Sequence, residues 1–196
     1  METLTSTDVV LDAALSAFLD FGIRRTSMGE IARRAGISPA TLYRRYAQKS
    51  DVVMGVGLRE AERMLEHLDR VIDAHAPPLE QLTALHVEVA DQLRSNALLR
   101  RVLDTEPESV LPKLTIEADP ILDMGRGYLG AFLVRLQHEG HLPAYDVVPV
   151  VDVLARLAQS EVLTPAREPL THAQTAAFVR DHLAPMIRLD VSEGTR

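Results

Sequence analysis

Basic side chains gather between residues 24 and 49 of a chain that is acidic overall. They are Arg24, Arg25, Arg33, Arg34, Arg44, Arg45 and Lys49, and Glu30 is the one acid within that segment. Residues 1–50 carry seven basic and five acidic groups, a net charge of +2, whereas the remaining residues carry 14 basic and 23 acidic groups, a net charge of −9. Positive charge concentrated in a short segment suits contact with phosphates. A cluster of charged residues is more often an ordinary solvated surface than a binding site. The local sequence pattern must therefore show which of the two this segment is.

Residues suited to catalysis or to metal binding are sparse. The absence of cysteine excludes disulfides, thiolate metal sites and cysteine nucleophiles. No glycine-rich phosphate loop occurs, and no serine, histidine and acid can be connected into a catalytic set. His138 and His141 flank an expected helix end at Gly140 and lack the spacing of a helical zinc site. We therefore expect no enzyme, no metal and no cofactor.

The composition is that of a folded, soluble protein. Hydrophobic residues make up 46% and charged residues 25% of the 196 residues, enough for a core and a solvated surface. The N-terminus lacks a basic region followed by an apolar stretch, and no apolar run approaches the roughly 20 residues of a membrane span. The expected location is cytoplasmic.

Residues 27–46 predict two short helices joined by a tight turn. Ser27 opens the first helix, with a glutamate three residues later at capping-box spacing. Gly36 permits the left-handed conformation that a tight turn favours. Ser38 caps the second helix and Pro39 suits its first position, which leaves backbone amides free to meet a phosphate. This is the pattern of a helix-turn-helix.

The outward face of the second helix combines small and basic residues. It offers Ala40, Thr41, Arg44 and Arg45, with Tyr43 and Tyr46 nearby. A helix of about eight residues is roughly 12 Å long, short enough to enter a major groove about 12 Å wide. Arg44 suits guanine, whereas tyrosine hydroxyls and Lys49 suit phosphates. The alternative is a helical hairpin with an ordinary solvated face.

The rest of the chain also has helical signals. We expect helices over 5–21, 49–74, 78–96, 98–103, 119–140, 147–161 and 171–189, and one more opened by a cap of Thr105 and Glu108. Further capping boxes are expected at Thr5–Asp8 and Thr171–Gln174. The valine-rich run 147–153 resembles a strand, but its apolar spacing is helical and it has no partner strand. The prediction is an all-α fold of about nine to ten helices.

Residues 9–53 resemble the DNA-binding domain of the TetR family of transcriptional regulators. The matching residues are Ala14, Phe18, Gly22, Thr26, Ile31, Ala32, Gly36, Ser38, Thr41, Leu42, Tyr43, Tyr46 and Lys49. Tyr46 stands where the family more often has phenylalanine, and Pro39 with Ala40 replaces a basic residue and a glycine. No Lys or Arg precedes Arg24, so a basic arm in the minor groove is not expected.

The resemblance implies an Ω-shaped, all-helical homodimer whose two headpieces enter successive major grooves, roughly 34–36 Å apart. The expected domains are a three-helix headpiece over 1–50, a helical regulatory domain over 51–190 and a tail over 191–196. The expected partners are double-stranded palindromic operator DNA, a second copy of the chain and a small-molecule effector. The DNA-binding candidates are Thr26, Ser27, Ser38, Pro39, Ala40, Thr41, Tyr43, Arg44, Arg45, Tyr46 and Lys49.

Two later helices resemble the family's dimerisation pair. Their apolar stripes are the candidate interface, namely Leu122, Leu129, Phe132, Leu133, Leu136, Val147, Val150, Val151, Leu154 and Leu157. Such a stripe also suits an intramolecular core. Gly125, Gly127 and Gly130 favour a close approach of backbones, although they also suit a broken or late-starting helix.

An effector pocket is expected among the helices between about 58 and 136. Its candidate residues are Met64, His67, Leu68, Leu85, His86, Val89, Leu103, Met124 and Tyr128, and an ordinary core is the alternative. Few aromatic residues and no tryptophan favour an apolar effector over a flat cationic one. Gly55 and Gly57 suggest a compliant connecting helix, or two glycines tolerated near a helix start.

These observations predict a ligand-responsive DNA-binding regulator, a repressor released from its operator by an effector. The alternative is a helical small-molecule sensor or interaction protein that does not bind DNA. The basic segment argues against that alternative, because a disused headpiece has no need of the charge. An all-helical enzyme has the least support.

Overall fold

The computed structural model describes residues 6–166 and 168–190, and every regular element among them is helical. In chain order they are α1 (Ser6–Phe21), α2 (Met28–Arg34), α3 (Pro39–Arg45), α4 (Lys49–Val71), α5 (Pro78–Ser95), α6 (Ala97–Thr105), η1 (Pro107–Ser109), α7 (Leu111–Leu114), α8 (Asp119–His138), α9 (Val148–Leu163), α10 (His172–Phe178), η2 (Val179–Leu183) and α11 (Ala184–Met186). The predicted all-α class is confirmed, and the valine-rich run is helical in α9. No helix in the described residues is long and apolar enough to cross a membrane.

Side-chain hydrogen bonds cap several of the helix starts. The hydroxyl of Ser27 accepts the amide of Glu30 at 3.1 Å, and that of Ser38 accepts the amide of Thr41 at 3.1 Å. The predicted Thr171–Gln174 capping box is complete. The predicted Thr5–Asp8 box lies outside the residues whose side chains the structure describes.

The predicted cap formed by Thr105 and Glu108 is wrong. Thr105 is the last residue of α6, and its hydroxyl donates back to the carbonyl of Arg101 at 2.7 Å. Glu106 follows as the C-cap, and the short turns η1 and α7 come next without a side-chain cap. Pro107 stops α6, because a proline disfavours helical backbone in the residue before it.

The structure forms two compact units. The first combines the chain up to Arg63 with Ser95–Ile121, and the second combines Met64–Arg94 with the chain from Leu122 onward. The chain passes between them within α4, at the end of α5 and near the start of α8. The predicted functional boundary at residue 50 falls inside the first unit and stays a prediction.

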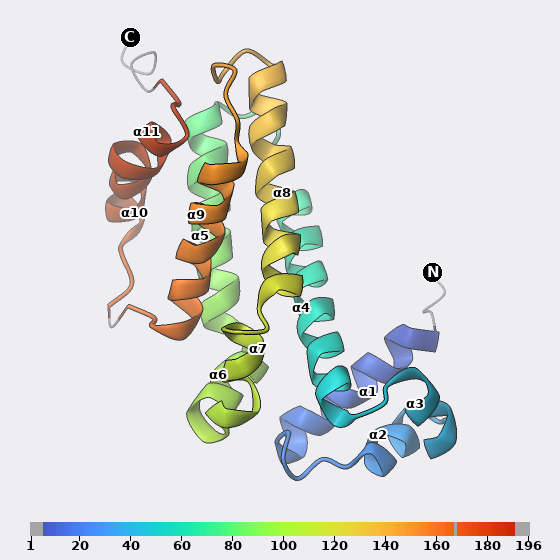
Figure 1. Cartoon of the computed structure of the whole chain (residues 1–196). Coiled ribbons are helices and arrows are strands. Elements are labelled where there is room, and N and C mark those ends of the chain that lie inside the picture. The colour runs from blue at the N-terminus through green and yellow to red at the C-terminus, as the bar shows by residue number, and fades with distance from the viewer. Residues whose placement is uncertain (1–5, 167, 191–196) are drawn as a thin grey trace. The chain divides into compact units, whose positions relative to one another are not determined.

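The core of the first unit joins segments that lie far apart in sequence. Helices α1, α2, α3 and the start of α4 gather around it (Figure 1). Its largest fully buried side chains are Val10, Phe18, Ile31, Leu42, Val52, Val56 and Val102. Val102 comes from α6, and Val110 lies in the same core. The α6–α7 segment is therefore part of the unit that carries the helix-turn-helix.

The second unit packs α5, α8 and α9 alongside one another, with α10 and α11 against them (Figure 1). Its core contains Leu68, Leu82, Leu85, Phe132, Leu133, Leu136, Leu142, Val151, Val179, Leu183, Ala184, Ile187 and Leu189. Gln81 is also buried there, and it accepts a hydrogen bond from Arg135 at 2.6 Å. Burial of this glutamine is tolerated because its amide also donates to two backbone carbonyls.

Candidate nucleic-acid interface

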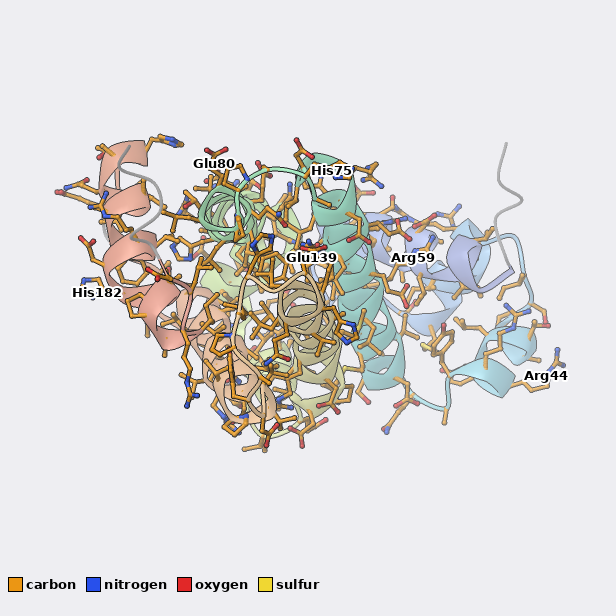
Figure 2. All side chains as sticks on the ribbon, turned by 90° about the horizontal axis from the view of Figure 1, so that it is seen from above. Arg44, Arg59, His75, Glu80, Glu139 and His182 are labelled. Atoms are coloured by element: carbon orange, nitrogen blue, oxygen red, sulfur yellow. The ribbon has the colours of Figure 1, made fainter. Side chains whose placement is uncertain are left out.

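Helix α3 is anchored on one side and open on the other. Leu42 is fully buried in the core of the first unit, whereas Pro39, Ala40, Tyr43, Arg44 and Arg45 are exposed. The side chain of Arg44 projects away from the protein (Figure 2). The face predicted to read DNA is therefore accessible.

The basic side chains of the first unit have different partners. Arg33 donates to Glu30 at 2.7 and 2.9 Å, and Arg34 donates to Glu30 at 2.8 Å and to Asp20 at 2.7 Å. These bonds, first from Arg33 and then from Arg34, lower the pKa of Glu30 to about 2. Arg44 forms no hydrogen bond or ion pair with any residue that the structure describes. Its guanidinium is thus available to an external anion or base.

The predicted serine and threonine contacts belong to the helix caps. Ser27 and Ser38 remain exposed while their hydroxyl oxygens accept backbone amides. The hydroxyl of Thr41 lies 2.9 Å from that of Ser38, so the two share a hydrogen bond. Each hydroxyl has one donor and two acceptor positions, which leaves capacity for a phosphate or a base.

Thr26 requires a correction, because its side chain does not face solvent. Only 1% of the residue is exposed, and its hydroxyl donates toward the carbonyls of Ala17 at 3.2 Å and Gly22 at 2.7 Å. A buried hydroxyl needs such partners to offset the loss of water. Thr26 therefore holds the turn between α1 and α2 rather than lying on the DNA-facing surface.

Lys49 also forms hydrogen bonds with the turn between α1 and α2. Its ammonium donates to the carbonyls of Ile23 at 2.8 Å, Thr26 at 3.0 Å and Arg24 at 3.1 Å. A lysine has three donors, and all three are used here. A phosphate bound by Lys49 would have to displace a carbonyl or share a donor with it.

Tyr46 is half-buried and packs against the core of the first unit, where burial raises its pKa. Gly55 of α4 lies beside it. A Cβ added to Gly55 would lie 3.0 Å from Leu11 Cδ2 and 3.5 Å from Tyr46 Cε1. Close packing therefore accounts for this glycine, and the compliant helix stays a hypothesis.

Comparison with known proteins shows which family the helix-turn-helix region resembles. Residues 10–54 match the sequence profile described as bacterial regulatory proteins, tetR family. Over 154 residues the chain is 29% identical to the helix-turn-helix transcriptional regulator Rv2250c of Mycobacterium tuberculosis, an alignment that covers 78% of each protein. Residues 10–54 therefore match the DNA-binding domain of the TetR family, and the chain is similar to TetR-type transcriptional regulators. The predicted span of 9–53 differs from the matched one by a single residue at each end.

Solved TetR-type structures share the whole fold. The TetR family repressor AlkX from Dietzia sp. strain DQ12-45-1b has a TM-score of 0.71 at 20% identity, covering 93% of this chain and 95% of that one. AibR, solved in complex with isovaleryl coenzyme A and operator DNA, has a TM-score of 0.53 at 16% identity, covering 94% and 100%. The fold similarity extends well beyond the helix-turn-helix.

The predicted effector residues of this TetR-type regulator fall into two groups. Leu103 lies in the first unit, where it packs against the core, and its assignment to a pocket stays a prediction. The remaining eight lie in the second unit. Among them Leu68 and Leu85 are buried in the core, and Val89 and Tyr128 pack against it.

Polar groups interrupt this largely apolar region of the second unit. His67 Nε2 lies 3.0 Å from Glu88 Oε2 across α4 and α5. Burial, together with the charge of Asp69, raises the pKa of Tyr128 to about 12. Burial lowers the pKa of His86, whose ring packs against Phe178. His67, His86 and Tyr128 thus all lie in the second unit.

The predicted dimer stripes need a correction as well. Phe132, Leu133, Leu136 and Val151 are buried in the core of their own chain, and Leu129, Val147, Val150 and Leu154 pack against that core. Leu122 is half-buried, and Leu157 is exposed. The exposed faces of the two helices carry Gly127, Ala131 and Val134 on α8, and Val153 and Leu157 on α9. Helical spacing alone did not distinguish the inward stripe from the outward one.

Glu106 is a residue that sequence reasoning missed. Its carboxylate accepts a hydrogen bond from the backbone amide of Arg24 at 2.8 Å, between positions 82 residues apart. The local signal was limited to a glutamate placed before a proline at a helix end. Nothing in that pattern indicates a contact with the headpiece.

Proposed function

We propose that this TetR-type regulator is a repressor that binds a palindromic operator as a homodimer and releases it when a small molecule binds. The main support for DNA binding is the exposed face of α3, on which Arg44 extends without a partner among the described residues. An arginine presented in this way suits a bidentate contact with guanine. Exposed Tyr43 suits a phosphate beside it, and Pro39 and Ala40 permit close approach to the bases.

The proposed dimer uses the exposed faces of α8 and α9. Val134, Val153 and Leu157 supply apolar surface, while Gly127 and Ala131 are small enough for two helices to approach closely. Arg126 ties α8 to α9 by donating to Asp152 at 2.7 and 2.9 Å. A twofold pair would match operator half-sites about 34–36 Å apart.

The proposed effector is a mainly apolar molecule with a polar end that binds the second unit. Met64, Met124 and Tyr128 would contact its apolar part, and His67 or His86 would orient its polar end. The AibR complex holds isovaleryl coenzyme A. Acyl coenzyme A thioesters are therefore the first class to test, with free fatty acids as the second.

The test begins with the intergenic DNA beside the gene. Fluorescence anisotropy should show binding to a duplex that contains a palindrome, with an affinity that falls steeply as salt rises. A panel of acyl coenzyme A thioesters should then weaken that binding at fixed salt. A dimer that fails to bind any duplex over this range would instead support the sensor without DNA binding.

A further inference from the structure

Polar contacts hold the turn between α1 and α2, which spans residues 22–27. Gly22 adopts a positive φ of 82°, which suits a residue without a side chain. Thr26 closes the other end of the turn by donating to the carbonyl of Gly22. Ser27 follows immediately as the N-cap of α2. The conformation of this turn therefore sets where the helix-turn-helix begins.

Glu106 reaches this turn from α6. Its Oε2 accepts the amide of Arg24, and its carboxylate occupies the space beside Gly22. A Cβ added to Gly22 would overlap with Glu106 Oε1 and would lie 3.1 Å from Cδ. The missing side chain of the glycine thus makes room for the carboxylate.

Lys49 and Glu106 act on the same peptide group. The carbonyl of Ile23 accepts from the Lys49 ammonium at 2.8 Å, and the amide that follows it, of Arg24, donates to the Glu106 carboxylate at 2.8 Å. Hydrogen bonds to charged groups are stronger than neutral ones, and bonds in a chain polarise one another. One peptide group therefore links a cation on α4 to an anion at the end of α6.

The backbone around Glu106 is itself held in place. Its amide donates to the carbonyl of Val102 at 2.9 Å, and Pro107 prevents the helix from continuing. Val102 and Val110, on either side, are buried in the core of the first unit. The carboxylate is thus presented to the turn from a fixed support.

We propose that Glu106 is a positioning residue for DNA binding, which holds the Ile23–Arg24 peptide against Lys49 and so sets the placement of α2 and α3. This inference rests on the proposed DNA-binding function. It runs against simple electrostatics, because an acidic side chain near a DNA-binding unit ordinarily weakens binding. The structure offers a matched acid for comparison. Glu108, two residues later and with a side chain that is 59% exposed, accepts a hydrogen bond from its own backbone amide and from the guanidinium of Arg24, the latter at 3.1 Å.

The experiment compares Glu106→Ala, Glu106→Gln and Glu108→Gln in the full-length chain. Fluorescence anisotropy measures the affinity for the operator duplex and for a scrambled duplex over a range of salt. Glu106→Ala should lower operator affinity about tenfold and reduce the operator preference, with an unchanged salt slope. Glu106→Gln should restore part of the loss, because its amide oxygen still accepts a hydrogen bond. Glu108→Gln should bind as tightly as the wild type or more tightly, because it frees Arg24.

A spectroscopic measurement separates positioning from loss of folding. In a ¹H–¹⁵N correlation spectrum, the Arg24 amide proton should move upfield in Glu106→Ala and by less in Glu106→Gln, with most other headpiece signals unmoved. Operator affinity equal to that of the wild type in Glu106→Ala would overturn the inference. So would an equal loss in Glu106→Ala and Glu108→Gln, or an Arg24 signal that does not move in either Glu106 variant. Failure of the wild type to bind any duplex would instead contradict the proposed function.

Discussion

Arg34 of α2 and Asp20 of α1 form an ion pair at 2.7 Å that joins the ends of two helices. Arg34 also donates to Glu30 and lies over the ring of Phe21, 5.0 Å from its centroid. The guanidinium therefore connects α2 to α1 rather than facing a ligand. The basic segment thus divides into residues that hold the headpiece together and residues, Arg44 above all, that are exposed on α3.

The first prediction concerns Glu30 and pH. Its folded-state pKa of about 2 lies below the ordinary value of 4.5, so its stabilising contribution is present at neutral pH and is lost as pH falls from 4.5 toward 2. Glu30→Gln should therefore slightly lower the free energy of unfolding at pH 7, and the difference from the wild type should shrink at pH 3. Urea denaturation of both proteins at pH 7 and at pH 3 measures this difference in the free energy of unfolding.

The control for that prediction is Glu62→Gln. Glu62 is exposed and forms a longer pair with Arg59, at 3.9 Å, so its replacement should change little at either pH. A difference between Glu30→Gln and the wild type that grows as the solution becomes more acidic would contradict the assignment.

The second prediction separates Arg44 from Arg33. Arg44→Ala should weaken operator binding by about tenfold or more and reduce the preference over a scrambled duplex, because a bidentate contact with a base is lost. Arg33→Ala should weaken binding to both duplexes alike and to a smaller extent, since Arg33 is already paired with Glu30. Anisotropy titrations on both duplexes measure the effects. Equal loss of operator preference in the two variants would argue against base reading by Arg44.

The third prediction compares two glycines with positive φ. Gly22 and Gly36 have φ values of 82° and 67°, and only Gly22 has another residue in the way of an added side chain. Gly36→Ala should cost about 1–2 kcal/mol from backbone strain. Gly22→Ala should cost more, because the new methyl group also displaces Glu106. Chemical denaturation of both variants gives the comparison, and a smaller cost for Gly22→Ala would count against the tight contact with Glu106.

The fourth prediction tests the outward face of α8 and α9. Val153→Glu should convert the proposed dimer to a folded monomer, because the charge would be buried between two copies without a partner. Light scattering gives the mass, and circular dichroism gives the helix content. Val71→Glu is the control, since Val71 is equally exposed but lies on α4. A Val153→Glu protein that remains dimeric would exclude this face as the interface.

The sequence by itself determined the helices and the local caps. Ser27, Ser38 and the Thr171–Gln174 pair act on amides within three residues, and Gly36 acts on its own backbone. Interactions of this range are visible as spacing in a sequence. The predicted Thr105–Glu108 cap does not form, because Pro107 ends α6 and Thr105 is the last residue of that helix.

Only the tertiary structure decided what the polar and apolar side chains do. Thr26 and Lys49 carry the family's motif, yet their polar atoms are used on the turn between α1 and α2. Val151 and Val153 share a helix, and packing alone placed the first in the core and the second at the surface. The contact of Glu106 with Arg24 joins residues 82 positions apart. Burial and charge pairing depend on segments brought together by the fold, which residue spacing along the chain does not encode.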